Sequence, residues 1–308
     1  MAWTAADIPD LSGKTALVTG ANSGLGFATA LELARHGAEV HLACRDRAKA
    51  EAAASSIRAE APNAALELVD LDLADLSSVR AAAAAFRAKR EALHLLVDNA
   101  GVMALPRLQT ADGFERQFGV NHLGHFALTG LLLDLLVRAP GARVVAVSSL
   151  MHKFGRMRFD DLHAERRRYG RWGAYCQSKL ANLLFTLELD RQLRAASIDV
   201  IATAAHPGYA ATELQAAGAR LEGARFKAAF MRFGNRLLGQ PAAHGAWPTL
   251  YAATAKDVRG GDFVGPGGLA ELRGAPKKAA PSARARDPEA ASRLWAASAE
   301  ATGVAFPF

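Results

Sequence analysis

The sequence predicts an α/β protein built on one doubly wound parallel sheet with helices on both faces. Two observations lead to this prediction. Short apolar runs alternate with helical patterns of about 10–15 residues, which is typical of consecutive β-α-β units. The apolar runs are hydrophobic on both faces, and strands need this when helices cover both sides of their sheet.

The expected elements follow one another along the chain. The strands, with helices between them, are expected over 14–19, 39–44, 66–71, 93–99, 142–149 and 198–208. The first two helices are expected over 23–36, ending at Gly37, and over 46–58. Residues 274–290 are rich in proline, alanine and basic side chains, which predicts exposed irregular chain before a last helix near 288–301.

The 308 residues are expected to form a single domain, because no linker divides the chain. Hydrophobic residues make up 51% of it, enough for a sizeable core. We see no secretory signal and no apolar run of about 18 residues, and so expect a cytoplasmic protein without a membrane span. The two cysteines, Cys44 and Cys176, have neither the spacing of a metal site nor that of a disulfide framework.

The formal net charge of +7 is unevenly distributed. Residues 150–174 carry seven basic and three acidic side chains, and residues 213–239 carry five and two. These two segments account for the whole excess, so the remainder of the chain is neutral overall. A uniformly basic surface for nucleic acid is therefore not expected.

Residues 19–26, T-G-A-N-S-G-L-G, lie between the first expected strand and the first helix. Glycines there allow a tight turn and a close approach of the backbone to a pyrophosphate, and the helix N-terminus adds N–H donors. The spacing departs from G-x-G-x-x-G, but the strand-turn-helix context favours a nucleotide site. We expect a Rossmann-type cofactor site formed here by Gly20, Asn22, Ser23, Gly24, Leu25 and Gly26.

The end of the second strand is expected to select the nucleotide. An acidic residue at this position, about 20 residues beyond the glycines, would bind the ribose 2′-hydroxyl of NAD(H). The sequence has neutral Cys44 there, followed by Arg45, whose guanidinium suits a 2′-phosphate. We therefore expect NADP(H). The alternative is that Arg45 is a solvated strand end paired with Asp46.

Tyr175 and Lys179 lie four residues apart in A-Y-C-Q-S-K-L-A-N, and on a helix they would share one face. A nearby ammonium would lower the tyrosine pKa from its ordinary value of ~10, which would suit proton exchange with a carbonyl or alcohol oxygen. Taken alone, the two could also form a surface pair of no consequence. Ser149 closes the fifth strand, where its hydroxyl can polarise a substrate oxygen.

Six motifs in sequence order carry a resemblance to a known family. They are T-G-A-N-S-G-L-G, D-N-A-G at 98–101, N-H at 121–122, S-S at 148–149, Y-C-Q-S-K at 175–179 and H-P-G at 206–208. Over roughly residues 10–270 the chain resembles the short-chain dehydrogenase/reductase family. L-A-C-R-D, N-H-L-G-H-F and the long gap between Ser149 and Tyr175 are similar to its retinol dehydrogenase and WW-domain oxidoreductase branch.

The resemblance implies a catalytic set of Asn121, Ser149, Tyr175 and Lys179. In that family Lys179 would also hold the nicotinamide ribose, and Asn121, although expected in mid-helix, would hold a water that connects Lys179 to solvent. The further contacts to NADP(H) that the resemblance implies come from Tyr175, Lys179, Asp72, Leu73, Asn99, Ala100, Gly101, Pro207, Gly208 and Thr212.

Several of these residues have alternative roles. Asp72 could cap a helix instead of contacting adenine, and Thr212 could be an N-cap instead of contacting the nicotinamide carboxamide. Asn99 is expected to support its turn and not to react. His122 and His125 are expected to pack and not to act as bases.

The expected function is hydride transfer between NADP(H) and a small apolar aldehyde, ketone or alcohol. The alternatives are C=C reduction on the same scaffold and a regulator that binds NADP(H) without turnover. The resemblance also implies a homodimer or tetramer, paired through the apolar faces of the helices at 127–137 and 180–189.

The domain is expected to consist of a core over about 10–270 and a C-terminal extension over about 271–308. A cover segment over about 213–240 follows H-P-G, where the family has its substrate-covering helices. In it Phe226, Ala229, Phe230, Phe233 and Leu237 form one apolar helix face. The segment could be a packed helix, a mobile cover for an apolar substrate, or a peripheral membrane contact.

Overall fold

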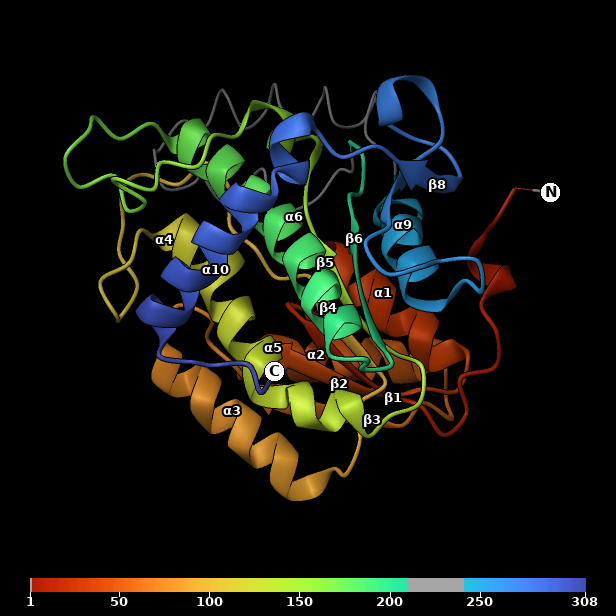
Figure 1. Ribbon diagram of the computed structural model, residues 1–308. Helices are drawn as coiled ribbons and strands as arrows, with labels where there is room; N and C mark the ends of the chain where they lie inside the picture. Colours follow the sequence, from red (N-terminus) through yellow and green to blue (C-terminus); the bar gives the residue numbers. More distant parts are fainter. Residues whose placement is uncertain (1, 210–240) are drawn as a thin grey trace, which may run out of the picture.

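The computed structural model describes residues 2–209 and 241–308, and it confirms the predicted fold class (Figure 1). One eight-stranded sheet has the order β3-β2-β1-β4-β5-β6-β7-β8, parallel throughout except for the antiparallel pair β7-β8. The strands are β1 Thr15–Thr19, β2 Glu39–Cys44, β3 Leu66–Asp70, β4 Leu95–Asp98, β5 Ala142–Val147, β6 Val200–Ala205, β7 Phe263–Pro266 and β8 Pro276–Ala279. The strand order reverses between β1 and β4, where ligands bind in sheets of this type.

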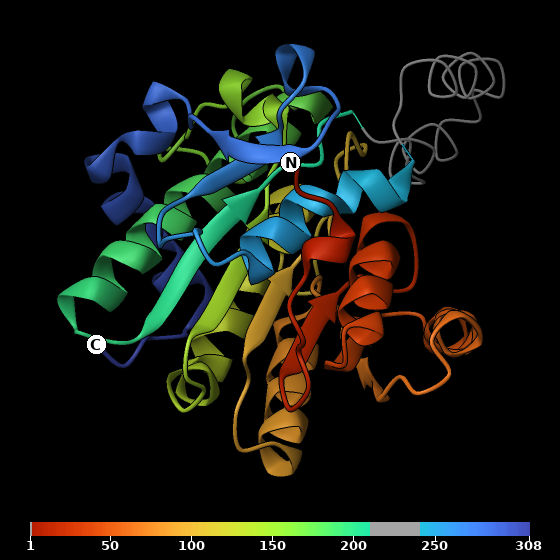
Figure 2. The same cartoon turned by 90° about the vertical axis from the view of Figure 1, so that its right-hand side faces the viewer.

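Helices cover both faces of the sheet (Figures 1 and 2). The described helices are α1 Gly24–Arg35, α2 Arg47–Glu60, α3 Leu76–Lys89, α4 Arg116–Phe118, α5 Gly124–Val137, α6 Arg171–Ala195, α9 Ala242–Thr254 and α10 Pro288–Thr302. One core cluster joins the sheet to α1, α2 and α9. A second joins the opposite face to α3, α5 and α6. Strands β1, β2 and β4 to β7 are almost entirely buried on both sides, as their composition predicts, whereas the edge strands β3 and β8 are only partly buried.

Asn121 does not lie in a regular α-helix. A five-residue π-helix, η2 (Gly119–Leu123), connects α4 to α5, and Asn121 lies at its centre. Short π-type turns inside helices are frequent at functional sites. This helical stretch, Arg116–Val137, is the one described helix long and apolar enough to cross a membrane, but its most apolar window is 78% buried inside the fold. It is therefore only weak evidence for a membrane span.

The prediction of irregular chain over 274–290 is wrong in part. Residues 276–279 form β8, which pairs with β7 along the edge of the sheet. Neither β7 nor β8 has an alternating apolar and polar pattern, so no local signal predicts these two strands. Asp287 caps the last helix by accepting hydrogen bonds from the backbone N–H groups of Glu289 and Ala290, and α10 begins where the sequence predicts.

The C-terminal residues 288–308 cover the faces of α5 and α6 that were expected to pair with a second chain. Trp295 stacks on Phe185 at a centroid distance of 5.9 Å and meets the edge of Phe126 at 5.2 Å. Phe306 lies 5.0 Å from Phe126. The side chains at 123–129, around the start of α5, and at 180–186, in α6, are all buried in the single chain. The chain's own C-terminus therefore occupies much of the surface on which the expected pairing of these helices depends, and the oligomeric state stays a prediction. The cover segment over 213–240 and Thr212 lie outside the described residues.

Candidate active site

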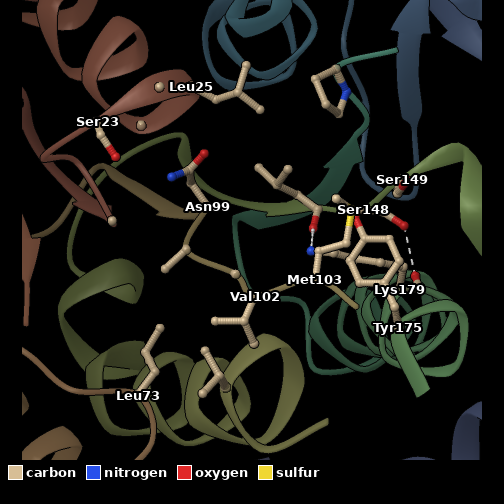
Figure 3. Close-up of a pocket in the computed structure, with 18 of the residues that line it drawn as sticks. Ser23, Leu25, Leu73, Asn99, Val102, Met103, Ser148, Ser149, Tyr175 and Lys179 are labelled. Atoms are coloured by element: carbon tan, nitrogen blue, oxygen red, sulfur yellow. Dashed lines mark hydrogen bonds between the residues drawn. The ribbon is translucent and has the colours of Figure 1, made fainter. Parts of the chain in front are cut away.

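A cavity of about 770 Å³ lies at the carboxyl ends of the parallel strands. Ser23, Leu25 and Leu73 lie on one side of it, and Ser148, Ser149, Tyr175 and Lys179 gather on the other, with Asn99 between them (Figure 3). Among the residues that the structure describes, every expected site residue except Asn121 lines this cavity. The fold thus brings together segments that are up to 188 positions apart in the sequence, Gly20 and Gly208 among them.

The glycine turn has the geometry of a phosphate cradle. Gly20 and Gly24 have φ angles of +66° and +56°, a region that side chains disfavour. A Cβ at Gly26 would lie 2.3 Å from the carbonyl oxygen of Gly20, so only glycine allows α1 to begin this close to β1. The first N–H groups of α1 consequently face the cavity, where they can bind an anion.

Asn99 supports this turn, as expected. Its Nδ2 donates to the carbonyl oxygen of Thr19 at 2.7 Å, and its backbone N–H donates to the Thr19 hydroxyl at 2.9 Å. His125 contacts the same hydroxyl at 2.9 Å through Nε2 and the carbonyl oxygen of Asn121 at 3.1 Å through Nδ1. Burial lowers the pKa of His125 to about 3, so the ring is neutral and acts as a structural bridge.

At the end of β2, Cys44 is buried and Arg45 is exposed at the rim of the cavity. The alternative pairing of Arg45 with Asp46 is not present. Asp46 instead caps α2 by accepting from the backbone N–H of Lys49 at 3.2 Å, and it forms an ion pair with the Lys49 ammonium at 3.1 Å. Within residues 2–209 and 241–308, Arg45 has no ion-pair partner. Its guanidinium is therefore available to a ligand.

Asp72 does not cap a helix, because Asp75 is the N-cap of α3. The Asp72 carboxylate accepts from the backbone N–H of Ala74 at 2.9 Å, which fixes the loop after β3. Leu73 follows it along the cavity wall. The two residues, next to the end of β2 in the sheet order, form one end of the cavity together with Arg45.

Tyr175 lies on the first turns of α6 and is 4% exposed. The Ser149 hydroxyl lies close enough to its phenol to favour the phenolate. Burial raises the pKa of Tyr175 to about 12, and the Ser149 hydroxyl only partly opposes this. The expected lowering by Lys179 is wrong for the protein alone, because the ammonium lies 5.9 Å from the centre of the phenol ring and desolvation dominates. The phenol is consequently protonated near neutral pH.

Lys179 is fully enclosed beneath Tyr175. Its Nζ donates to the carbonyl oxygen of Val147 at 2.9 Å, a bond drawn in Figure 3. Burial lowers the pKa of Lys179 to about 8. A buried ammonium with one protein acceptor retains two further donors, which can serve a bound ligand.

The two serines at the end of β5 have different surroundings. The Ser148 hydroxyl donates to the carbonyl oxygen of Lys179 at 2.8 Å, so it ties β5 to α6. The Ser149 hydroxyl is partly exposed in the cavity, accepts from the backbone N–H of Met151 at 3.2 Å and contacts Tyr175. This difference is consistent with Ser149, and not Ser148, meeting a substrate oxygen.

Asn121 acts on the loop after β4. Its Oδ1 accepts from the backbone N–H of Val102 at 2.7 Å, and its Nδ2 donates to the carbonyl oxygen of Val102 at 2.9 Å and to the Ser178 hydroxyl at 2.9 Å. The side chain therefore links the loop at 99–102 to α6. Gly101 packs closely beside it, since a Cβ there would lie 3.2 Å from Asn121 Oδ1 and 3.5 Å from Lys179 Nζ, so a larger residue would shift the Asn121 amide slightly.

The apolar wall of the cavity could not be read from the sequence. It consists of Met103, Leu105, Leu108, Leu150, Met151, Trp172, Tyr209 and Leu272. These residues come from loops and helix starts that share no local pattern. The segment that precedes α6 is held close to this wall. Its Tyr169 hydroxyl donates to Glu115 Oε1 at 2.9 Å and accepts from Gln117 Nε2 at 2.8 Å. In the described part of the chain, no cluster of three metal-ligating side chains is found.

Comparison with known proteins identifies relatives over almost the whole chain. The family model for short chain dehydrogenase matches residues 14–220. Retinol dehydrogenase 13 from Homo sapiens is 45% identical over 300 residues, which cover 96% of this chain and 87% of that protein. Retinol dehydrogenase 12 from Homo sapiens is 43% identical over 298 residues, covering 96% and 88%.

Solved structures agree with these sequence relatives. A crystal structure of an uncharacterised protein from Mycobacterium paratuberculosis superimposes with a TM-score of 0.82 at 44% identity and covers all of both chains. An NAD(P)-dependent gluconate 5-dehydrogenase from Beutenbergia cavernae, solved with bound NADP at low occupancy, has a TM-score of 0.60 at 25% identity and covers 80% of this chain and 91% of its own.

Proposed function

This chain belongs to the short-chain dehydrogenase/reductase family, in the branch of the retinol dehydrogenases, and from that premise we propose that it reduces an apolar aldehyde or ketone with NADPH, or oxidises the corresponding alcohol. One observation carries the proposal. The buried phenol of Tyr175 lies near the Ser149 hydroxyl and beside Lys179 in the cavity that the glycine turn also lines. A proton donor, a polarising hydroxyl and a phosphate cradle thus share one cavity.

The residues present fit NADP(H). A Cβ at Gly26 would collide with the backbone of Gly20, and Gly20 and Gly24 have positive φ angles, so glycine keeps this turn open and a pyrophosphate can approach the start of α1. Arg45 has no carboxylate partner in the described structure and would meet the 2′-phosphate, with Cys44 adding no repulsion. The NADP bound to the relative from Beutenbergia cavernae supports the same choice. When bound, NADPH supplies the hydride.

The chain's own residues supply the proton and hold the substrate oxygen. Because burial keeps the phenol protonated, Tyr175 Oη can donate a proton to a carbonyl oxygen as negative charge develops there. The Ser149 hydroxyl donates a hydrogen bond to the same oxygen and stabilises that charge. The Lys179 ammonium favours the phenolate that remains. In the oxidative direction, Tyr175 takes the proton back.

The cavity wall supports an apolar substrate. Eight apolar or aromatic side chains line the part of the cavity away from the glycine turn, and Trp172 stands at an angle of 83° to the ring of Tyr175. An apolar carbonyl compound would lose little hydration free energy on binding against such a wall, whereas a strongly hydrated compound would lose favourable contacts with water.

The test is consumption of reduced nicotinamide, followed by absorbance, with a panel of aldehydes, ketones and retinoids and with both cofactors. We expect turnover with NADPH and apolar carbonyl compounds, and much less with NADH. Tight NADPH binding without turnover of any carbonyl compound would favour a nucleotide-sensing regulator. Turnover limited to conjugated alkenes would favour C=C reduction.

A further inference from the structure

Glu271 lies outside every motif, in the loop between β7 and β8, and its backbone conformation is unusual. It has a φ of +58°, and Ala270 before it has a φ of +51°. Two consecutive non-glycine residues in the left-handed region are disfavoured, and such conformations persist only where the surroundings hold them. This turn aims the Glu271 side chain back toward the end of β6.

There the carboxylate meets His206, whose side chain is completely buried. His206 Nε2 lies 3.1 Å from Glu271 Oε2, and the backbone N–H of Gly208 donates to His206 Nδ1 at 3.2 Å. A carboxylate only accepts and an N–H only donates, so these two contacts define the tautomer. The ring carries its proton on Nε2, and this N–H donates a hydrogen bond to the Glu271 carboxylate. The unprotonated Nδ1 accepts from Gly208 and so holds the turn at Pro207 and Gly208.

The same loop contacts that turn a second time. The backbone N–H of Tyr209 donates to the carbonyl oxygen of Leu272 at 2.9 Å. A Cβ at Gly208 would lie 2.4 Å from this oxygen, so the two backbones are in direct contact. Pro207, Gly208, Tyr209 and Leu272 all line the cavity.

Glu271 also faces the segment after Ser149. The Lys153 ammonium, on the 3-10 helix η3 (Leu150–Phe154), lies 3.5 Å from Glu271 Oε2. This pair is partly exposed, with the Lys153 side chain 43% accessible, and it is expected to contribute little. The contact with buried His206 is therefore the stronger connection between Glu271 and the cavity.

The sheet order shows which end of the cavity these contacts serve. β5 and β6 are neighbours, with Val147 paired to Ala205, so the residues that follow them lie side by side. Ser149 and Pro207 are thus at the reacting end, whereas Arg45 and Asp72 follow β2 and β3 at the other end.

From these contacts we infer that Glu271 is a positioning residue, which through His206 holds the turn 207–209 and the Leu272 wall in place for the nicotinamide half of NADP(H). The inference rests on the proposed function, because it assumes that NADP(H) occupies the cavity. It assigns Glu271 no contact with the reacting atoms.

The test compares two ligands that share the adenine end. Glu271→Ala should weaken NADPH binding roughly tenfold, because a hydrogen bond to a charged group is lost. Adenosine 2′,5′-bisphosphate, which lacks the nicotinamide half, should bind within about twofold of wild type, since its contacts are distant from the change. Both are measured by quenching of tryptophan fluorescence or by calorimetry.

Four further variants separate the effect of side-chain reach from those of charge and of an unrelated surface change. Glu271→Gln keeps an acceptor for His206 and should stay within about threefold of wild type for NADPH, as should Lys153→Met. Glu271→Asp keeps the charge, but its side chain is shorter by one methylene and no longer reaches His206. It should therefore weaken NADPH binding, as Glu271→Ala does. Glu300→Ala, at an exposed glutamate on α10, is the control and should change neither ligand.

Two outcomes would overturn the inference. Unchanged NADPH binding in both Glu271→Ala and Glu271→Asp would mean that Glu271 holds nothing in place. Equal weakening of both ligands would mean a general structural role. Should Glu271→Ala fail to fold, Glu271→Asp and Glu271→Gln decide the matter by the same comparison. If wild type itself did not bind NADPH, the proposed function would fail, and the wild-type titration identifies that case separately.

Discussion

Tyr175 shows how burial sets the direction of a catalytic pKa. A phenol with a nearby ammonium suggests a lowered pKa, yet enclosure in the protein raises the pKa of Tyr175 to about 12. Desolvation disfavours the phenolate more than the Ser149 hydroxyl favours it. A protonated phenol suits proton donation to a carbonyl oxygen. In the reaction that we propose, Lys179, whose own pKa burial lowers to about 8, stabilises the phenolate that remains.

The choice of cofactor should depend on Arg45. Arg45→Ala should weaken NADPH binding about tenfold to a hundredfold and leave NADH nearly unchanged, because charged hydrogen bonds to the 2′-phosphate are lost. Cys44→Asp should go further, since an acid repels the phosphate and accepts from the ribose hydroxyl. Fluorescence titration with both cofactors measures this, and Arg47→Ala, next to Arg45 but paired with Asp70 and Glu51, is the control. Equal weakening of both cofactors by Arg45→Ala would show that the selector lies elsewhere.

Residues within one local motif could be predicted, and residues of the cavity wall could not. Gly20, Gly24 and Gly26 need a strand, a turn and a helix in direct succession, and the sequence shows all three. Trp172 and Leu272 reach the cavity only because the sheet order brings distant loops together. Glu271 was missed for the same reason, since its partner His206 is 65 positions away.

At the scale of elements, α10 and the last six residues complete the core over α5 and α6. Gly130 is where the two layers come closest. A Cβ there would lie 2.7 Å from Val304 Cγ1 and 2.9 Å from Phe306 Cε2. Among the described elements, this contact explains why two long apolar helices leave little apolar surface uncovered.

We expect Gly130→Val to destabilise the protein by about 1–3 kcal/mol, because the added side chain overpacks this contact. Val137→Ala is the control, as Val137 is 48% exposed on the same helix and its loss should change stability by less than about 0.5 kcal/mol. Urea unfolding measures both. Full stability of Gly130→Val would mean that the C-terminal residues do not pack on α5.

The first six strands along the chain and the last helix follow from hydrophobic pattern and helix caps, but β7 and β8 do not. Phe263–Pro266 contains a glycine and a proline, and Pro276–Ala279 contains two lysines, so neither has the composition of a strand. Pairing with β6 stabilises β7, and pairing with β7 stabilises β8. The π-type turn at Asn121 has no recognisable sequence signal either.

At the scale of the whole molecule, the protein buries several neutral histidines. Burial lowers the pKa of His122 and His125 to about 3 and that of His206 to about 4. Each ring takes up a proton near pH 6.5 in the unfolded chain but not in the folded protein. Its contribution to the free energy of unfolding is therefore complete above that pH and is lost as pH falls toward 4. Burial raises the pKa of Asp98 to about 8 and also raises that of Asp190, and these two carboxyls act in the opposite direction. They are outnumbered by the histidines, since burial also lowers the pKa of His41, His94, His152 and His163.

We therefore expect the urea midpoint of unfolding to fall between about pH 7 and pH 5, with each such histidine contributing up to about 1.4 kcal/mol per pH unit. His122→Asn should reduce the slope, and His244→Asn, at an exposed position, should not. A midpoint that is constant or rises toward pH 5 would contradict this account.

The packing of α10 also changes the expected state of assembly. Since the chain's own C-terminus covers α5 and α6, we expect a monomer by light scattering at micromolar concentration. A stable dimer would require a different interface from the helix pairing that the family resemblance implies. It would contradict this expectation without changing the chemistry of the site.

The most direct test of the central claim, that Tyr175 is the proton donor of a carbonyl reductase, is the turnover of Tyr175→Phe. Only the hydroxyl is removed, so the variant should fold and bind NADPH like wild type while its turnover with the best carbonyl substrate falls by at least ~100-fold. Activity is measured by the loss of reduced nicotinamide and binding by fluorescence titration, with Tyr251→Phe, which alters a tyrosine on α9 outside the cavity lining, as the matched control. A Tyr175→Phe variant that binds NADPH and keeps near-full turnover would contradict the account.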